Sequence, residues 1–229
     1  MNKIFCLGDG YAHGHIWPEW PQILQALCPE YTIVPVTGIG AGNEILISQL
    51  LTQNISNQKV IFQWAQHNRF DKLLQDNDWK QIAESDSVYH FNFYKTIDQT
   101  WWLSSASQQP EIKKYHDFYI QEEQSKLRYQ NQQMLVKTYL EFNRAEYYFT
   151  STEAQENFSR QSRFDHVRGT EIQPSPIVHF FFVTEQLAPA INLKIDENLV
   201  EILKNKIQNH KWVPYDPDRE EIWNNMSKF

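Results

Sequence analysis

The feature that most constrains the fold is an alternation of short apolar segments with segments whose apolar residues repeat at helical spacing. Residues 3–7 form an apolar run that ends in a glycine-rich turn, which predicts a buried strand. Trp20–Leu27 has helical spacing, and residues 31–36 are β-branched and alternating. Residues 44–51 then predict a second helix and residues 60–64 a third strand. This order favours a parallel sheet covered by helices and joined by right-handed crossovers.

The second half of the chain continues this pattern. Residues 115–143 contain no glycine or proline and predict a long helix, and residues 145–149 predict a fourth strand. Residues 176–187 and 198–208 predict two further helices. The chain has 229 residues and is 41% hydrophobic, which suits one substantial core. We therefore expect one domain over residues 1–211.

Two segments do not fit the alternation. Residues 71–114 are rich in Asp, Gln, Ser and aromatic residues, so we expect an irregular aromatic insertion or a lid over the carboxyl edge of the sheet. Residues 212–229 form a C-terminal tail that is aromatic and polar but has no helical period. Its rings need cover, so the tail either packs back on its own domain, which we favour, or anchors the chain to a partner.

Charge and motifs exclude several classes of function. The net charge is −7, so we expect neither nucleic acid nor an anionic membrane as a partner. The N-terminus does not resemble a signal peptide and no apolar run is long enough to span a bilayer, so we expect cytoplasmic synthesis. Cys6 and Cys28 lie in apolar segments and are predicted to be buried thiols. No third ligand is spaced with His13 and His15, and the glycines of 38–42 lack a P-loop Lys, so we expect no metal and no cofactor.

Four short blocks follow predicted strands or precede a predicted helix. The first block is Gly8-Asp9-Gly10, the second is residues 38–43, the third is residues 64–71, and the fourth is residues 171–179. In this order they resemble the conserved blocks of the SGNH (GDSL-type) hydrolases. The resemblance implies a three-layer, flavodoxin-like α/β fold. More narrowly, the first block, residues 14–18 and the run Gln-Trp-x-x-x-x-Arg-Phe-Asp resemble SGNH-like proteins encoded by tailed phages of cyanobacteria.

The resemblance also assigns positions to the family's catalytic groups. Gly10 stands where those enzymes have their nucleophilic serine, and Gln173 stands where they have the histidine, two residues after Glu171. Gly40 and Asn68 match the two oxyanion-hole donors. Because the three strand-end loops that carry Gly10, Gly40 and Asn68 would meet at one edge of a parallel sheet, we expect these residues to converge there.

Glycine cannot attack a carbonyl, and glutamine cannot take up the proton that a serine would lose. We therefore expect a module that does not hydrolyse, and that serves glycan binding or structural assembly, with a phage virion as the context that the resemblance implies. The alternative is a divergent carbohydrate esterase or deacetylase, or an acyl esterase, that recruits His13, His15 or His67. His179 falls inside a predicted helix, one turn from two apolar residues, and is predicted to be packed.

Six residues are candidates for ligand binding, and each has a competing structural role. Asp9 could hold turn amides, Asn43 could cap the helix that follows it, and most of the tryptophans could belong to the core. Trp101 and Trp102 are neighbours in an extended segment, so at least one ring is expected at the surface. The ligand candidates are Asp9, Asn43, Trp64, Arg69, Trp101 and Trp102.

Overall fold

The centre of the molecule is a four-stranded parallel sheet. A computed structural model describes residues 2–9, 12, 17–37, 41–67, 69, 71–74, 93–95, 100–103, 121–154 and 174–229. The strand order is β2-β1-β3-β7, and every described pair in this sheet is parallel. The strands are β1 (Lys3–Gly8), β2 (Thr32–Thr37), β3 (Lys59–Trp64) and β7 (Glu146–Ser151). The predicted α/β class and parallel sheet are therefore confirmed.

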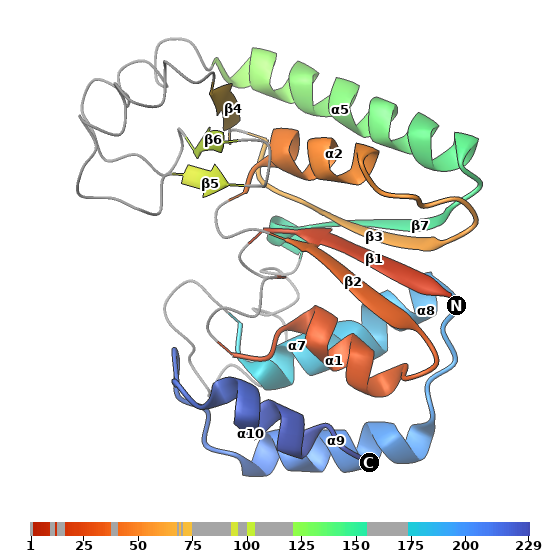
Figure 1. Ribbon diagram of the computed structural model, residues 1–229, viewed down its shortest axis with the longest axis vertical. Coiled ribbons are helices and arrows are strands. Elements are labelled where there is room, and N and C mark those ends of the chain that lie inside the picture. Colours follow the sequence, from red (N-terminus) through yellow and green to blue (C-terminus); the bar gives the residue numbers. More distant parts are fainter. Residues whose placement is uncertain are drawn as a thin grey trace.

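Helices cover both faces of this sheet (Figure 1). One face carries α2 (Asn43–Leu51) and α5 (Glu122–Phe142), and the other carries α1 (Trp20–Leu27) and α7 (Pro176–Phe182). A π-helical turn, η4 (Val183–Leu187), and a short α8 (Ala188–Ala190) extend α7. Beyond α1 and α7 lies an outer pair, α9 (Glu197–Asn209) and α10 (Arg219–Met226). The side that holds the chain's C-terminus is thus two helices deep.

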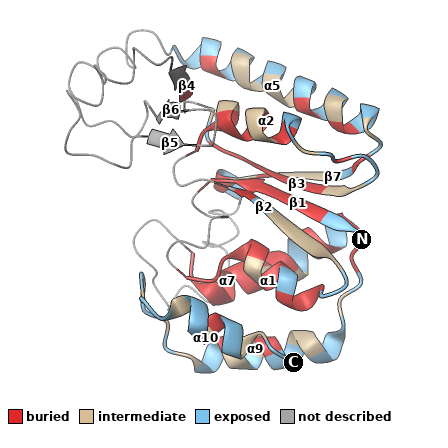
Figure 2. Cartoon of the chain, in the orientation of Figure 1, coloured by how far each residue is buried: buried red, intermediate tan, exposed pale blue. Residues whose placement is uncertain are grey.

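Strands β1 and β3 are buried on both faces, which explains their continuous apolar sequence. From Ile4 to Gly8 every residue of β1 is buried, and alternate residues enter different cores. Ile4 and Cys6 face α1 and α7, whereas Phe5 and Leu7 face α2 and α5. Figure 2 shows the buried centre of the sheet between the two helical layers. A period of two along each central strand therefore divides the side chains between two cores.

Helix α1 follows directly from its sequence. Trp20, Ile23, Leu24 and Leu27 recur at helical spacing and are all buried. Pro21 lies in the first turn, where its missing N–H is not needed. The Gln22 side chain accepts a hydrogen bond from the Glu19 amide at 3.2 Å and so closes the start of the helix. The predicted bounds of this helix match the structure.

The segment after β3 contains a second, smaller sheet. Strands β4 (Asp71–Leu74), β5 (Phe93–Lys95) and β6 (Thr100–Leu103) form an antiparallel sheet in the order β4-β6-β5. This sheet lies beyond the carboxyl ends of the parallel strands, beside the start of α2 (Figure 1). The insertion that the sequence analysis treats as irregular therefore includes regular antiparallel pairing.

The tail contains a helix that the sequence pattern did not predict. Helix α10 is short and begins with acidic residues. Trp223 is its one buried residue, so its sequence shows no apolar period. Trp223 is 8% exposed and belongs to the core under α1 and α7, with Trp212 packed against it. The tail thus packs on its own chain through these two rings. Among the described helices, none is both long and apolar enough to cross a bilayer.

Candidate functional site

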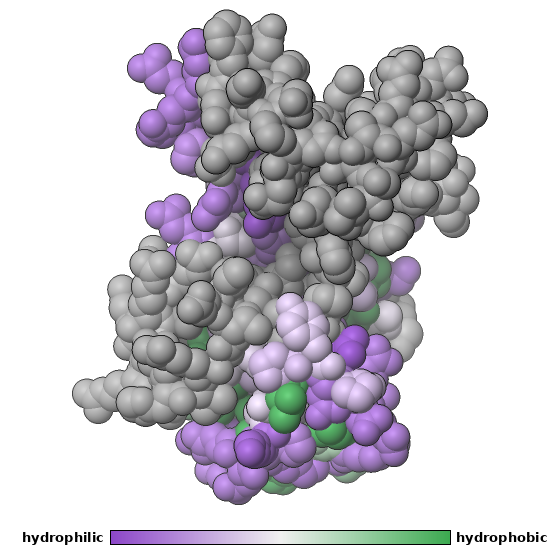
Figure 3. Space-filling view, turned by 90° about the vertical axis from the view of Figure 1, so that its left-hand side faces the viewer, coloured by the Kyte–Doolittle hydropathy of each residue, from purple (hydrophilic) through white to green (hydrophobic). Residues whose placement is uncertain are grey.

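The candidate site lies where β1 and β3 end and α2 begins. Asp9 directly follows β1, residues 65–71 follow β3, and Asn43 opens α2 after β2. Parallel strands bring their carboxyl ends to one edge, which is where open α/β sheets bind ligands. Figure 3 views the molecule from this side, and its described surface is mostly hydrophilic, with a few hydrophobic residues in the lower half of the view.

An ion pair joins the ends of β1 and β3. Arg69 Nη1 lies 2.9 Å from Asp9 Oδ2. The Asp9 side chain is 5% exposed and the Arg69 side chain 30% exposed. Because a buried carboxylate is costly without a counter-charge, the Arg69 guanidinium offsets part of the cost of burying Asp9 at this edge. Both residues are predicted ligand contacts, and the structure brings them into direct contact with each other.

Asn43 does not cap α2, which corrects that structural expectation. The N-cap residue is Gly42, and Asn43 is the first residue of the helix. The Asn43 side chain instead pairs with the backbone of Ala65 at the end of β3. Its Nδ2 donates to Ala65 O at 3.2 Å, and its Oδ1 accepts from Ala65 N at 2.9 Å. Asn43 is 2% exposed, so this amide ties α2 to the third block from inside the protein.

Glu44 connects three elements beside this pair. Its Oε1 accepts a hydrogen bond from Gln132 Nε2 at 2.9 Å and lies 3.4 Å from Arg128 Nε, and both of those residues belong to α5. Its Oε2 accepts from the Asp71 amide at 3.4 Å. Arg128 also donates to the Arg69 carbonyl at 2.7 Å. Glu44 and Arg128 therefore fix the backbone that carries Arg69.

Asp71 is the first residue of β4, and its buried carboxyl group lies beside the start of α2. It is 3% exposed, and neither carboxyl oxygen makes a hydrogen bond of good geometry within the described part of the chain. Burial, and then the nearby Glu44 charge, raise the pKa of Asp71 to about 7, although the Ile45 and Gly42 amides and Arg69 pull it down. A Cβ on Gly42 would lie 2.8 Å from Asp71 Cγ, so only glycine leaves room for the carboxyl group.

The described part of the fourth block lies close to the segment that follows the first block. Trp17 Nε1 donates a hydrogen bond to the Pro174 carbonyl at 2.8 Å, and Trp17 is 2% exposed. Ser175 is the N-cap residue of α7, as predicted. Its hydroxyl is buried without a hydrogen bond in the described structure, so it occupies the capping position without making the capping bond.

Several predicted side chains are parts of the core. Trp64 is 1% exposed and packs against Phe62, Tyr129 and Phe149, so its ring is not presented at the surface. His179 is fully buried in α7, as predicted, and burial lowers its pKa to about 3, which keeps the imidazole neutral.

The two cysteines are free and buried, which confirms that prediction. Burial raises the pKa of Cys28, with a further contribution from Glu30, to about 12. Burial alone raises the pKa of Cys6 well above its usual value. Neither thiol is a nucleophile at neutral pH.

Most of the remaining predicted site residues lie outside the described part of the chain. Gly10, Gly40, Asn68, Glu171 and Gln173 lie outside the described residues, as do His13 and His15. The expected convergence of Gly10, Gly40 and Asn68 therefore stays a prediction. Trp101 and Trp102 both belong to β6, but their side chains lie outside the described part. His67 is half-buried, and its carbonyl accepts a hydrogen bond from Arg128 at 3.3 Å.

Sequence reasoning missed the three charged residues that organise this edge, Glu44, Asp71 and Arg128. The hydrogen bonds that join them to the edge span at least 27 positions in the chain, so no local pattern marks these residues. The one available signal was the glycine before the helix, because a missing side chain there leaves space for another group. The buried carboxyl of Asp71 occupies that space.

The described edge combines a fixed ion pair with a carboxyl group that can exchange a proton near neutral pH. No group of three or more His, Cys, Asp or Glu side chains within the described ranges could hold a metal ion. The comparisons with known proteins found no matching family model, no matching curated protein and no matching solved structure.

Proposed function

We propose that this chain is an SGNH-hydrolase-like module that has lost hydrolysis and acts by binding. One observation carries the proposal. Hydrogen bonds or ion pairs join the neighbourhoods of all four sequence blocks. Asp9 of the first block pairs with Arg69 of the third, and Asn43 of the second pairs with Ala65 of the third. Trp17, seven positions after the first block, bonds to Pro174 of the fourth.

The order of the strands agrees with this proposal. In chain order the parallel strands are arranged 2-1-3-4, as in the first four strands of flavodoxin-like folds. Such folds bind ligands beyond the carboxyl ends of their strands. The ion pair and the buried carboxyl group lie in that place here.

Loss of hydrolysis follows from the residues at two positions. Gly10 has no nucleophile and Gln173 has no basic nitrogen, and the family mechanism needs both. Among the described residues, half-buried His67 is the one recruited histidine of the alternative that the structure includes, and the other titratable candidates are poor. His179 is sealed in the core, and both thiols are buried and protonated.

A protein partner is the form of binding that the described surface favours. Helix α5 has three buried residues, Ser125, Val136 and Leu140, and its outer face exposes large apolar side chains. These are Leu127, Met134, Leu135 and Phe142, which are 52–85% exposed. Apolar residues gathered on one face mark interaction sites, so we favour assembly with another protein, a virion protein in the context that the sequence resemblance implies. Glycan binding through Trp101 and Trp102 is the other form of the proposal.

Restoring the missing groups tests the loss of hydrolysis. The wild-type chain and Gly10→Ser should show no turnover of short-chain p-nitrophenyl esters or acetylated glycans, since a serine without a positioned base is a weak nucleophile. The double variant Gly10→Ser/Gln173→His should exceed the single variant by about 100-fold or more, the usual contribution of a positioned base.

Two outcomes would contradict the loss of hydrolysis, and a third would change the kind of partner. Turnover by the wild-type chain that His15→Ala abolishes would establish the divergent esterase instead. Equal activity of the single and double variants would show that Gln173 does not stand at the position of the base. If the chain binds an immobilised glycan saturably and Trp102→Ala abolishes that binding, the proposed partner is a glycan and not a protein.

A further inference from the structure

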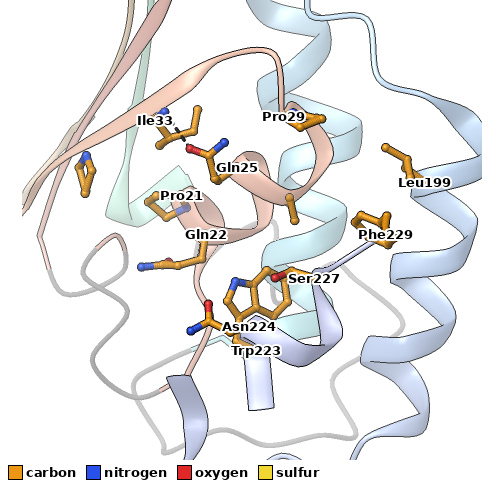
Figure 4. A pocket seen from close by; sticks show the side chains of 12 residues that line it. Pro21, Gln22, Gln25, Pro29, Ile33, Leu199, Trp223, Asn224, Ser227 and Phe229 are labelled. Atoms are coloured by element: carbon orange, nitrogen blue, oxygen red, sulfur yellow. Dashed lines mark hydrogen bonds between the residues drawn. The ribbon is translucent and has the colours of Figure 1, made fainter. Parts of the chain in front are cut away.

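A groove lies on the opposite side of the sheet from α2 and α5, away from the Asp9–Arg69 edge. Its walls come from α1, from the edge strand β2, from α9 and from the C-terminal segment. Figure 4 shows side chains of these elements facing one space, with Pro21, Gln22 and Gln25 on one side and Trp223 and Phe229 on another. The volume is about 530 Å³. Ligand pockets commonly enclose roughly 300–1,000 Å³.

The side chains that line the groove carry no charge. Eight of the 12 lining residues are apolar, and the other four are Gln, Asn or Ser. A charged ligand would lose its hydration there without meeting an ion partner in the lining, which is unfavourable. Lys206 is not a lining residue, but its ammonium group lies 4.8 Å from the centroid of the Phe229 ring. That ammonium group already donates to the carbonyl groups of Met226 and Lys228.

Of the four polar side chains in the lining, two already form hydrogen bonds within the protein and two are available to a ligand. Gln22 Oε1 accepts from the Glu19 amide at 3.2 Å. Gln25 is committed, because its Nε2 donates to the Tyr31 carbonyl at 3.1 Å and its Oε1 accepts from the Ile33 amide at 3.0 Å. Asn224 and Ser227 make no side-chain hydrogen bond within the described structure, and both line the groove. A ligand can therefore use an amide and a hydroxyl from α10 and its C-terminal end.

The edge of β2 does not favour binding of an added strand. The outward amide of Ile33 is bonded to Gln25, as the dashed line in Figure 4 shows. Two residues further, on the same edge, Pro35 has no amide hydrogen to donate. Strand addition depends on such main-chain donors. Recognition in this groove must instead use contacts between side chains and a compact ligand.

We propose that this groove binds an uncharged, mainly apolar small molecule that carries a hydrogen-bonding group. The proposal is independent of the function proposed for the carboxyl edge. It rests on the volume, the uncharged lining, the available Asn224 and Ser227 side chains and the blocked strand edge.

A matched pair of fluorescent probes tests the proposal on the full chain. N-phenyl-1-naphthylamine is neutral, and 8-anilino-1-naphthalenesulfonate has the same ring system with one added negative charge. We expect saturable binding of one neutral probe per chain. The anionic probe should bind about tenfold more weakly or worse, because its charge finds no partner in the lining.

Variants then assign the binding to the groove. Ser227→Trp and Asn224→Trp place a ring in the opening, and each should weaken the neutral probe about tenfold. Gln208→Trp is the matched control on α9, exposed and outside the lining, and it should bind as the wild type does. Thermal melts of all variants verify folding, and two separate blocking positions guard against the failure of one of them.

Three results would overturn the proposal. The neutral probe could fail to saturate, the anionic probe could bind as tightly as the neutral one, or both blocking variants could fold and bind unchanged. The last result would place the probe on another apolar surface, such as the outer face of α5.

Discussion

Asp71 shows how one residue links the sequence to the behaviour of the site. Its carboxyl group sits at the N-terminus of α2, where a helix dipole favours a negative charge, yet burial and Glu44 oppose that charge. The unfavourable terms are larger, so the pKa rises from 3.8 to about 7. The folded protein thus binds this proton more tightly than the unfolded chain does.

This shift predicts a pH dependence of stability with a definite sign. Between about pH 4 and pH 7 the folded state keeps a proton that the unfolded state has released, so stability falls as pH rises through this window. The loss is on the order of 2–4 kcal/mol and is complete above the folded-state pKa. Asp71→Asn removes the ionisation, so it should be more stable than the wild type at pH 8 and show a smaller difference at pH 5.

Urea unfolding of both proteins at the two pH values measures this effect. Asp218→Asn is the control, because Asp218 is exposed and makes no capping hydrogen bond. The same fall in stability between pH 5 and pH 8 for Asp71→Asn and the wild type would show that Asp71 is not the titrating group.

At the scale of elements, the link between β1 and the segment after β3 depends on the Asp9–Arg69 pair. Asp9 is almost fully buried, whereas Arg69 is about a third exposed, so solvent screens part of the attraction. A double-mutant cycle with Asp9→Ala and Arg69→Ala should give a coupling free energy on the order of 1 kcal/mol. The exposed i,i+4 pair of Glu122 and Lys126 on α5 is the matched control and should show smaller coupling.

Denaturant unfolding of each single and double variant supplies the cycle. Coupling no larger than that of the control pair would mean that other contacts of Asp9 hold this edge together. Loss of soluble protein in Arg69→Ala but not in the double variant would still support the pair, because removing both charges leaves no uncompensated carboxylate.

The elements themselves were largely predictable from the sequence. Strands β1, β2, β3 and β7 and helices α1, α2, α7 and α9 begin and end within a few residues of the predicted bounds. Continuous apolar runs and helical spacing are local properties, so one sequence reveals them. Helix α10 was missed because it buries one residue, and the Asn43 pairing was missed because its partner, Ala65, lies 22 positions away.

The candidate site was less predictable for the same reason. Asp9 and Arg69 were both expected at the carboxyl edge from block order, but their direct ion pair was not. Glu44, Arg128 and Asp71 acquire their roles when α5 and β4 pack on α2, which no spacing in the sequence records.

At the scale of the whole molecule, the outer pair α9 and α10 covers the layer formed by α1 and α7 (Figure 1). Most of the core on this side of the sheet comes from that inner layer. The Trp223 side chain belongs to that core. The Lys206 ammonium of α9 donates a hydrogen bond to the Met226 carbonyl of α10 at 2.8 Å. Tyr215 and Phe229 remain more than half exposed, so the tail's rings are only partly covered by the chain itself. Phe229 contributes to the groove, which makes the tail part of a surface as well as of the core.

Truncation after Lys211 should therefore destabilise the protein. Removing a buried tryptophan alone costs about 3–5 kcal/mol, and each kcal/mol corresponds to a shift of about 2–4 °C in a chain of this size. We expect the melting temperature of the truncated chain to fall by about 10 °C. Trp223→Ala should reproduce most of this loss, whereas truncation after Lys228, which removes the exposed Phe229, should leave the melt nearly unchanged. Calorimetry of the four proteins measures these shifts, and an unchanged melt after removal of residues 212–229 would show that the tail does not stabilise its own core.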